Sequence, residues 1–108
     1  MPKRVLLDEC LPRHLKRSRE GHHVRTVPEV GWASKENGEL LALAAADFDV
    51  FVTVDRNLTF QQSPRNLRIA VIVLVARGNR LIDLLPLVPK LREALETVDR
   101  GEIVRLGV

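Results

Sequence analysis

Carboxylates stand beside apolar stretches at three separated places in the chain. Asp8 and Glu9 directly follow the apolar residues 5–7, and Asp55 closes the run VFVTVD. A third acid, Glu39, opens a stretch rich in leucine and alanine. Because a carboxylate is costly to desolvate, each of these groups must face water, a cation or a partner.

Gathered at one place, these oxygens would repel one another until a hard cation entered. Mg²⁺ or Mn²⁺ is typically held by one or two carboxylates and keeps several waters. Such an ion can activate a water molecule and screen a phosphodiester under attack. Asp8, Asp55 and one oxygen ligand from the segment Glu36, Asn37, Glu39 are the candidates for this chemistry. The competing interpretation is structural, since acids at strand ends also cap helices and solvate loops.

The elements that would position these acids alternate along the chain. Short apolar or β-branched runs predict strands at 5–7, 22–27, 49–55, 68–76 and 102–106. Between them, helices are expected at 11–21, 36–47 and 80–101, the last being a long helix or a bent pair because of Pro86 and Pro89. Alternation of this kind predicts an α/β fold with three layers, helices covering both faces of a parallel sheet of four or five strands. Ligands of such sheets lie at the carboxyl ends of the strands, where Asp8 and Asp55 are both expected.

Composition sets the limits for the function. The 108 residues, 45% of them hydrophobic, fit a single domain spanning 1–108, and the net charge of +3 is compatible with a polyanionic partner. The single cysteine, Cys10, excludes an internal disulfide. No apolar run approaches about 18 residues, so no membrane partner is expected. An acidic pair stands where a signal peptide would have its apolar centre, and we expect a cytoplasmic protein.

Four segments resemble a known family, the PIN-domain nucleases, and within it the short stand-alone PIN-like proteins. They are LLDECLP, GWASKENGELLALA, FVTVDRNLTFQQ and PLVPKLREAL, in that order. The resemblance implies a PIN-like domain whose acidic residues lie at the carboxyl ends of a parallel sheet. It also implies an Mg²⁺- or Mn²⁺-dependent endoribonuclease that cleaves RNA. Many relatives are the toxin of a type II toxin–antitoxin pair, with an antitoxin protein as partner, and many form homodimers.

Carried over residue by residue, the resemblance assigns Asp8 to the first acid of the family pattern. Asp55 matches the acid after the third strand, with Thr53 as its usual hydroxyl neighbour. Where many relatives carry an aspartate in the helix, this chain has Asn37, which leaves Glu39 as the available carboxylate. Either residue remains a candidate for the helix ligand.

The fourth acid of the pattern is replaced. Two residues after Asp55 the chain has Asn57, which offers an oxygen without a charge. The implied catalytic and metal-binding set is therefore Asp8, Glu39 and Asp55, with Asn57 assisting, and it would bind a metal more weakly than four acids.

Further residues surround this set. Glu9, Asn37 and Thr53 are candidates for supporting the ligands, although strand alternation turns Glu9 away if Asp8 points into the site. The candidates for RNA contact are the basic residues near the expected site: Arg13, Lys16, Arg17, Lys35 and Arg56. The alternative for all five is an ordinary solvated surface.

Two other functions compete with the nuclease. A catalytically silent PIN-like module that binds protein or RNA is favoured by Asn57. A receiver-like domain phosphorylated on Asp55 would also place an acidic pair after the first strand. It requires a hydroxyl residue after the fourth strand and a lysine after the fifth, and the segments VARGN and VRLGV contain neither.

Overall fold

A computed structural model describes residues 3–11, 21–33, 37–54, 68–78 and 80–107. Its strands are β1 (Arg4–Leu7), β2 (His23–Thr26), β3 (Val50–Thr53), β4 (Ala70–Val75) and β5 (Ile103–Gly107). Its helices are α1 (Asn37–Asp47), α3 (Leu81–Leu84), the 3₁₀ turn η3 (Leu85–Leu87) and α4 (Val88–Thr97). These elements match the predicted order. The helix expected at 11–21 falls almost wholly outside the described residues.

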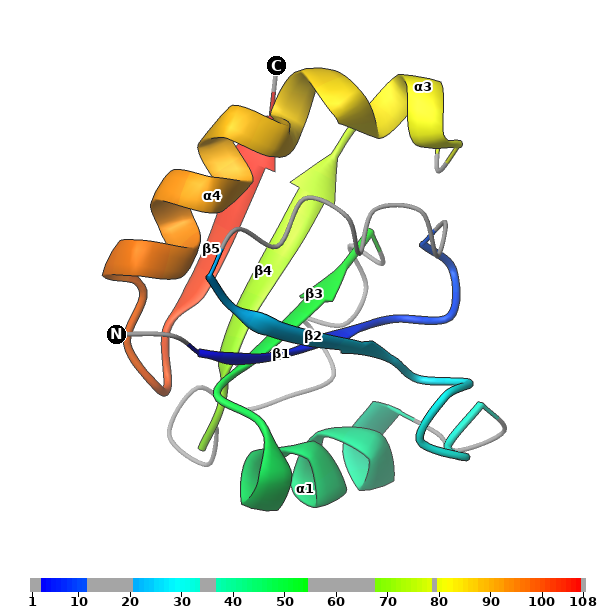
Figure 1. The fold of residues 1–108 in the computed structure, drawn as a ribbon, viewed down its shortest axis with the longest axis vertical. Coiled ribbons are helices and arrows are strands. Elements are labelled where there is room, and N and C mark those ends of the chain that lie inside the picture. Colours follow the sequence, from blue (N-terminus) through cyan, green and yellow to red (C-terminus); the bar gives the residue numbers. More distant parts are fainter. Residues whose placement is uncertain (1–2, 12–20, 34–36, 55–67, 79, 108) are drawn as a thin grey trace.

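All the described strands join one five-stranded parallel sheet in the order β2-β1-β3-β4-β5 (Figure 1). The α/β class and the parallel sheet are therefore as predicted. The order reverses direction between β1 and β3, because the chain builds β2 on one side of β1 and all later strands on the other. In sheets of this order that reversal is the usual place for a ligand.

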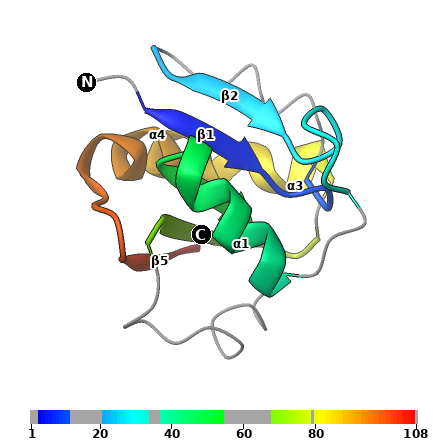
Figure 2. The same ribbon diagram turned by 90° about the horizontal axis from the view of Figure 1, so that it is seen from below.

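The two faces of the sheet pack against different helices, as Figures 1 and 2 show. Side chains of successive strand residues point to opposite faces, so Leu6 packs with α1 whereas Val5 and Leu7 pack with α3, η3 and α4. This arrangement gives the three layers that the sequence predicted.

Helix α1 contacts the sheet through Leu40, Leu41 and Ala44, each no more than 4% exposed. From the sequence alone, helical spacing predicts Leu40, Leu43 and Ala44 on the packing face. The prediction for Leu43 is wrong, since Leu43 is 36% exposed and Leu41 is buried in its place. At 100° per residue, Leu41 lies closer than Leu43 to the line through Leu40, Ala44 and the following Phe48. The face that packs on the sheet therefore differs from the predicted one in a single residue, Leu41 in place of Leu43.

The C-terminal helical segment is a bent set of short helices. Pro86 lies in η3 and Pro89 in the first turn of α4, where the missing N–H has no helical partner to lose. From α4, Leu91, Ala94 and Leu95 are buried against the sheet. The prolines thus break the segment without costing α4 an internal hydrogen bond.

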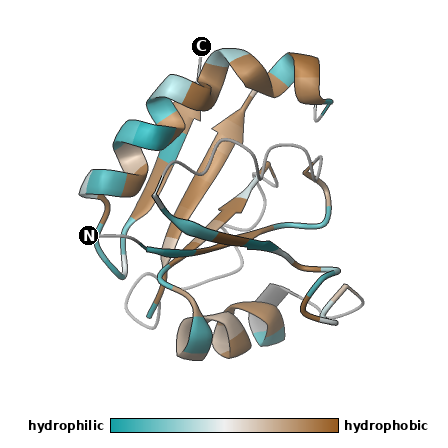
Figure 3. Cartoon of the chain, in the orientation of Figure 1, coloured by the Kyte–Doolittle hydropathy of each residue, from teal (hydrophilic) through white to brown (hydrophobic). Residues whose placement is uncertain are grey.

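The inner strands carry the most apolar sequence. Every residue of β3 is buried, and so are the first five of β4, which Figure 3 shows as almost continuous brown. From the sequence alone, the run RIAVIVLVA (68–76) predicts a central strand because it is the most apolar of the five. Strand β4 is an inner strand between β3 and β5, while β3 occupies the middle of the sheet. Among the described residues, no helix is both long and apolar enough to cross a bilayer.

Candidate functional site

The ends of β1 and β3 meet at the point where the strand order reverses. Leu7 pairs with Val52, and the N–H of Asp8 continues the ladder by donating to the carbonyl of Val52 at 2.9 Å. Asp8 therefore lies beside Thr53, the last residue of β3. By strand alternation both side chains lie on the face that packs against α1.

Two hydrogen bonds from described residues hold the Asp8 carboxylate. The Thr53 hydroxyl donates to Oδ2 at 2.6 Å, and the backbone N–H of Glu9 donates to Oδ1 at 2.8 Å. Asp8 is only 8% exposed and Thr53 is fully buried. Since a buried carboxylate without partners would be strongly destabilising, these bonds offset its desolvation and fix its orientation. Each oxygen keeps lone-pair capacity for a further ligand.

Cys10 lies next to the hydrogen-bonded pair Asp8 and Thr53. Its Sγ is 3.9 Å from the Thr53 hydroxyl oxygen. Burial raises the pKa of the Cys10 thiol above its ordinary value, and the negative charge of Asp8 acts in the same direction. A raised pKa keeps the thiol protonated at neutral pH, so Cys10 is a poor candidate for a thiolate nucleophile.

Two other acids expected at this site, Glu9 and Glu39, belong to the same end of the sheet as Asp8. Glu9 is exposed, and its contact with Asp8 is made by its backbone N–H. Helix α1 runs from the end of the sheet where β2 stops to the end where β3 starts, so its first residue Asn37 and its first-turn acid Glu39 belong to the same end as Asp8 (Figure 2). The side chain of Glu39 is exposed.

The described residues alone do not assemble a three-ligand metal site. Within residues 3–11, 21–33, 37–54, 68–78 and 80–107, no three His, Cys, Asp or Glu side chains come close enough to hold an ion. The predicted ligands Asp55 and Asn57 lie outside these ranges, directly after Val54. So do the predicted RNA-contacting residues: Arg13, Lys16, Arg17, Lys35 and Arg56.

Two polar residues outside the predicted site, His22 and Arg100, have structural roles. His22 is buried, with Nδ1 accepting from the N–H of Lys3 and Nε2 at 3.0 Å from Glu96 Oε1. Arg100 donates to the carbonyls of Ala45, Arg68 and Phe48. Neither role can be predicted from local sequence, because the hydrogen-bond partners of His22 and Arg100 come from distant segments of the chain.

Comparison with known proteins gave no match: no family model, no curated protein and no solved structure is significantly similar to this chain.

Proposed function

We propose that this protein is an Mg²⁺- or Mn²⁺-dependent endoribonuclease of the PIN-like type. The observation that carries the proposal is the buried Asp8 carboxylate, held by Thr53 at the reversal of strand order. Asp55 follows Thr53 by two residues in the chain and supplies the second acid.

The donor set suits a hard cation because it consists of oxygens. Asp8, Glu39 and Asp55 would hold the ion, and Asn57 would add an uncharged oxygen. Bound there, the cation would supply charge neutralisation and water activation for phosphodiester hydrolysis.

The role of Thr53 is to position Asp8. A carboxylate with one oxygen committed to a buried hydroxyl and the other to a backbone N–H has little rotational freedom. The basic residues that the sequence places near the expected site would guide the RNA backbone: Arg13, Lys16, Arg17, Lys35 and Arg56. An antitoxin protein and a second copy of the chain are the further partners, and the cytoplasm is the compartment.

A second candidate is a silent PIN-like module that binds RNA or a protein without cleavage. Asn57 favours it because the expected fourth charge is missing. The receiver-like alternative finds no such support: Ala76 follows β4 where a hydroxyl is needed, and β5 contains Arg105 but no lysine.

The test is metal binding and RNA cleavage by the wild type and Asp8→Asn. Mn²⁺ binding is measured by calorimetry, and cleavage by incubation with structured RNAs in Mn²⁺ or EDTA. We expect Mn²⁺-dependent cleavage that Asp8→Asn reduces at least about 100-fold, since one ligand is lost. Asp99→Asn is the matched control, because it removes the same charge from an exposed residue before β5.

Three outcomes decide between the candidates. Cleavage lost in Asp8→Asn and kept in Asp99→Asn supports the nuclease. RNA binding without cleavage at any Mn²⁺ concentration supports the silent module and contradicts the nuclease. Phosphate transfer from acetyl phosphate to Asp55 would contradict both.

A further inference from the structure

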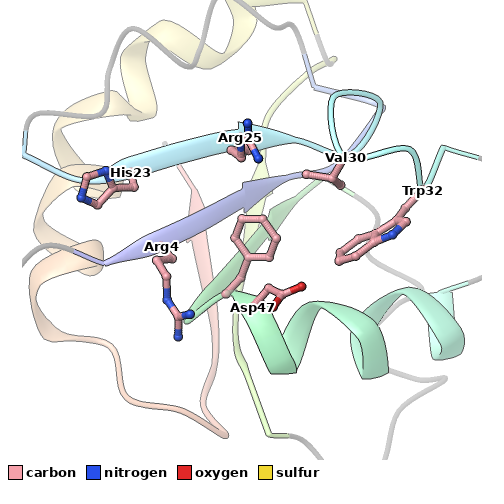
Figure 4. Close-up of a pocket in the computed structure, with 7 residues that line it drawn as sticks. Arg4, His23, Arg25, Val30, Trp32 and Asp47 are labelled. Atoms are coloured by element: carbon pink, nitrogen blue, oxygen red, sulfur yellow. The ribbon is translucent and has the colours of Figure 1, made fainter.

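A cavity of about 420 Å³ lies between β2 and α1, and neither Asp8 nor Thr53 lines it (Figure 4). Its volume falls within the range of roughly 300–1,000 Å³ that is usual for small-molecule sites. Its lining combines cationic, aromatic and acidic side chains: Arg4, His23, Arg25, Val30, Trp32, Asp47 and Phe48.

Strand register explains why His23 and Arg25 of β2 face this cavity. His23 pairs with Arg4, and Arg25 pairs with Leu6, which packs toward α1. His23 and Arg25 therefore point to the α1 side of the sheet. Both are exposed, whereas Val24 between them is buried on the opposite face. An edge strand with polar residues on an otherwise apolar face leaves that part of the face open to a ligand.

The basic side chains of the lining differ in their availability. Arg4 is committed to Asp49, with its Nη2 3.4 Å from Oδ1 and its backbone N–H 2.9 Å from Oδ2. Within the described part of the chain, neither His23 nor Arg25 makes a side-chain hydrogen bond or ion pair. In Figure 4 both extend from β2, and Asp47 lies across from them on α1. An anion would therefore be attracted to the β2 wall and repelled by the α1 wall.

Trp32 supplies a flat surface in the same cavity. Its indole is half-buried and meets Phe48 edge to face, with ring centroids 6.2 Å apart and an interplanar angle of 80°. The contact restrains the indole while part of it stays exposed. Restrained aromatic side chains next to cations are the arrangement on which nucleobases stack.

We propose that this cavity binds one nucleotide, its base against Trp32 and its phosphate on Arg25 and His23. The chemistry is the same for a free mononucleotide and for one residue of a single-stranded RNA. Only the RNA form rests on the proposed nuclease function. The cavity requires no metal, so binding persists in EDTA and in Asp8→Asn.

Trp32 is the only tryptophan in the chain, so its fluorescence reports directly on the cavity. The full-length protein in EDTA is titrated with adenosine monophosphate, with adenosine, and with a single-stranded RNA octamer, and calorimetry gives a second readout. We expect quenching by the monophosphate, and at least about tenfold weaker binding of adenosine because it lacks the charged group. Arg25→Ala should weaken monophosphate binding about tenfold, and Arg77→Ala, an exposed arginine of another groove, should leave it unchanged.

Binding of the monophosphate identifies a free nucleotide as the ligand, and tighter binding of the octamer identifies RNA. The proposal is overturned if neither adenosine monophosphate nor the RNA octamer binds at about 1 mM. It is also overturned if Arg77→Ala weakens binding as much as Arg25→Ala, since the attraction would then be diffuse charge. Arg25-dependent binding without any RNA cleavage supports the nucleotide site. It contradicts only the proposed nuclease activity.

Discussion

The hydroxyl of Thr53 donates a 2.6 Å hydrogen bond to the carboxylate of Asp8, and joins two strand ends that lie 45 residues apart in the chain. The bond lies where the strand order changes direction, and neither residue is more than 8% exposed. A hydroxyl to carboxylate bond at such a length is charge-assisted and stronger than a neutral one. It links the sheet geometry directly to the orientation of one acid.

Thr53→Val keeps the shape of the side chain and removes the donor. The Asp8 carboxylate would remain buried without its 2.6 Å hydrogen bond, so the free energy of unfolding should fall by about 1–3 kcal/mol. Urea unfolding measures the change. Thr97→Val is the control, because Thr97 is exposed and its hydroxyl bonds only helix carbonyls; its effect should be below about 0.5 kcal/mol. Equal effects of the two substitutions would show that the Asp8 bond adds nothing to stability.

Asp8→Asn should separate stability from function. The asparagine oxygen can accept from the Glu9 N–H, and its NH₂ can donate to a reoriented Thr53 hydroxyl, so both contacts have a replacement. Without metal, we expect the unfolding free energy to stay within about 1 kcal/mol of the wild type, because a buried charge is lost along with its stronger bonds. Urea unfolding in EDTA measures this. A loss above about 3 kcal/mol would instead make Asp8 a structural residue.

The fold was predictable because its signals are local. The apolar runs of β1, β3 and β4 have a strand's length and alternate with helical segments, which together require a parallel sheet. The packing face of α1 was predicted with one wrong residue, since Leu41 and Leu43 are equally apolar and only contact with the sheet distinguishes them. The position of Asp8 at the strand end was also predictable, as it follows from where an apolar run stops.

The remaining contacts depend on tertiary pairing. The Thr53 to Asp8 bond needs the register of β1 against β3, and the cavity beside Trp32 needs the register of β2 against β1. One signal for that cavity was present: in HVRT the polar residues His23 and Arg25 flank the apolar Val24, which indicates a strand with one open face. Whether that face is covered depends on the placement of α1, which no local pattern specifies.

Cys10 should react slowly with alkylating agents. Burial raises its pKa and outweighs the hydrogen bond from the backbone of Val54, and the charge of Asp8 raises the pKa further. At pH about 8, we expect iodoacetamide to modify the folded protein at least tenfold more slowly than the chain in urea. Asp8→Asn should accelerate the folded reaction by removing the nearby charge. Equal rates for folded and unfolded chains would contradict the partial burial of the thiol in the structure.

His22 should be a neutral residue with its proton on Nε2. Its Nδ1 accepts from the backbone N–H of Lys3 at 3.0 Å, which leaves Nε2 to donate to Glu96. Long-range ¹H–¹⁵N NMR should show this tautomer at neutral pH. His22→Leu should lower the unfolding free energy by about 1–3 kcal/mol, because it leaves the Lys3 N–H without its acceptor. Glu96→Gln, which keeps an acceptor at an exposed position, should change stability by less than about 1 kcal/mol.

Asp49 joins the start of β1 to the turn before β5. It accepts from the backbone N–H of Arg4 at 2.9 Å and from Nη2 of Arg100 at 3.0 Å. Partial burial acts to raise the pKa of the Asp49 carboxyl, but the bonds from Arg4 and Arg100 outweigh it and hold that pKa below its ordinary value of 3.8.

This pKa shift predicts an acid-dependent loss of stability. A carboxyl whose pKa is lower in the folded chain stabilises the fold above its unfolded pKa, and that contribution disappears as pH falls through the folded pKa. Asp49→Asn should therefore lower the unfolding free energy at pH about 7, by no more than about 1 kcal/mol because solvent reaches the carboxylate. Below pH 3.8 the difference from the wild type should shrink toward zero. Urea unfolding across this range measures it, with Asp99→Asn as the control, and a difference that grows toward acid pH would contradict the assigned direction.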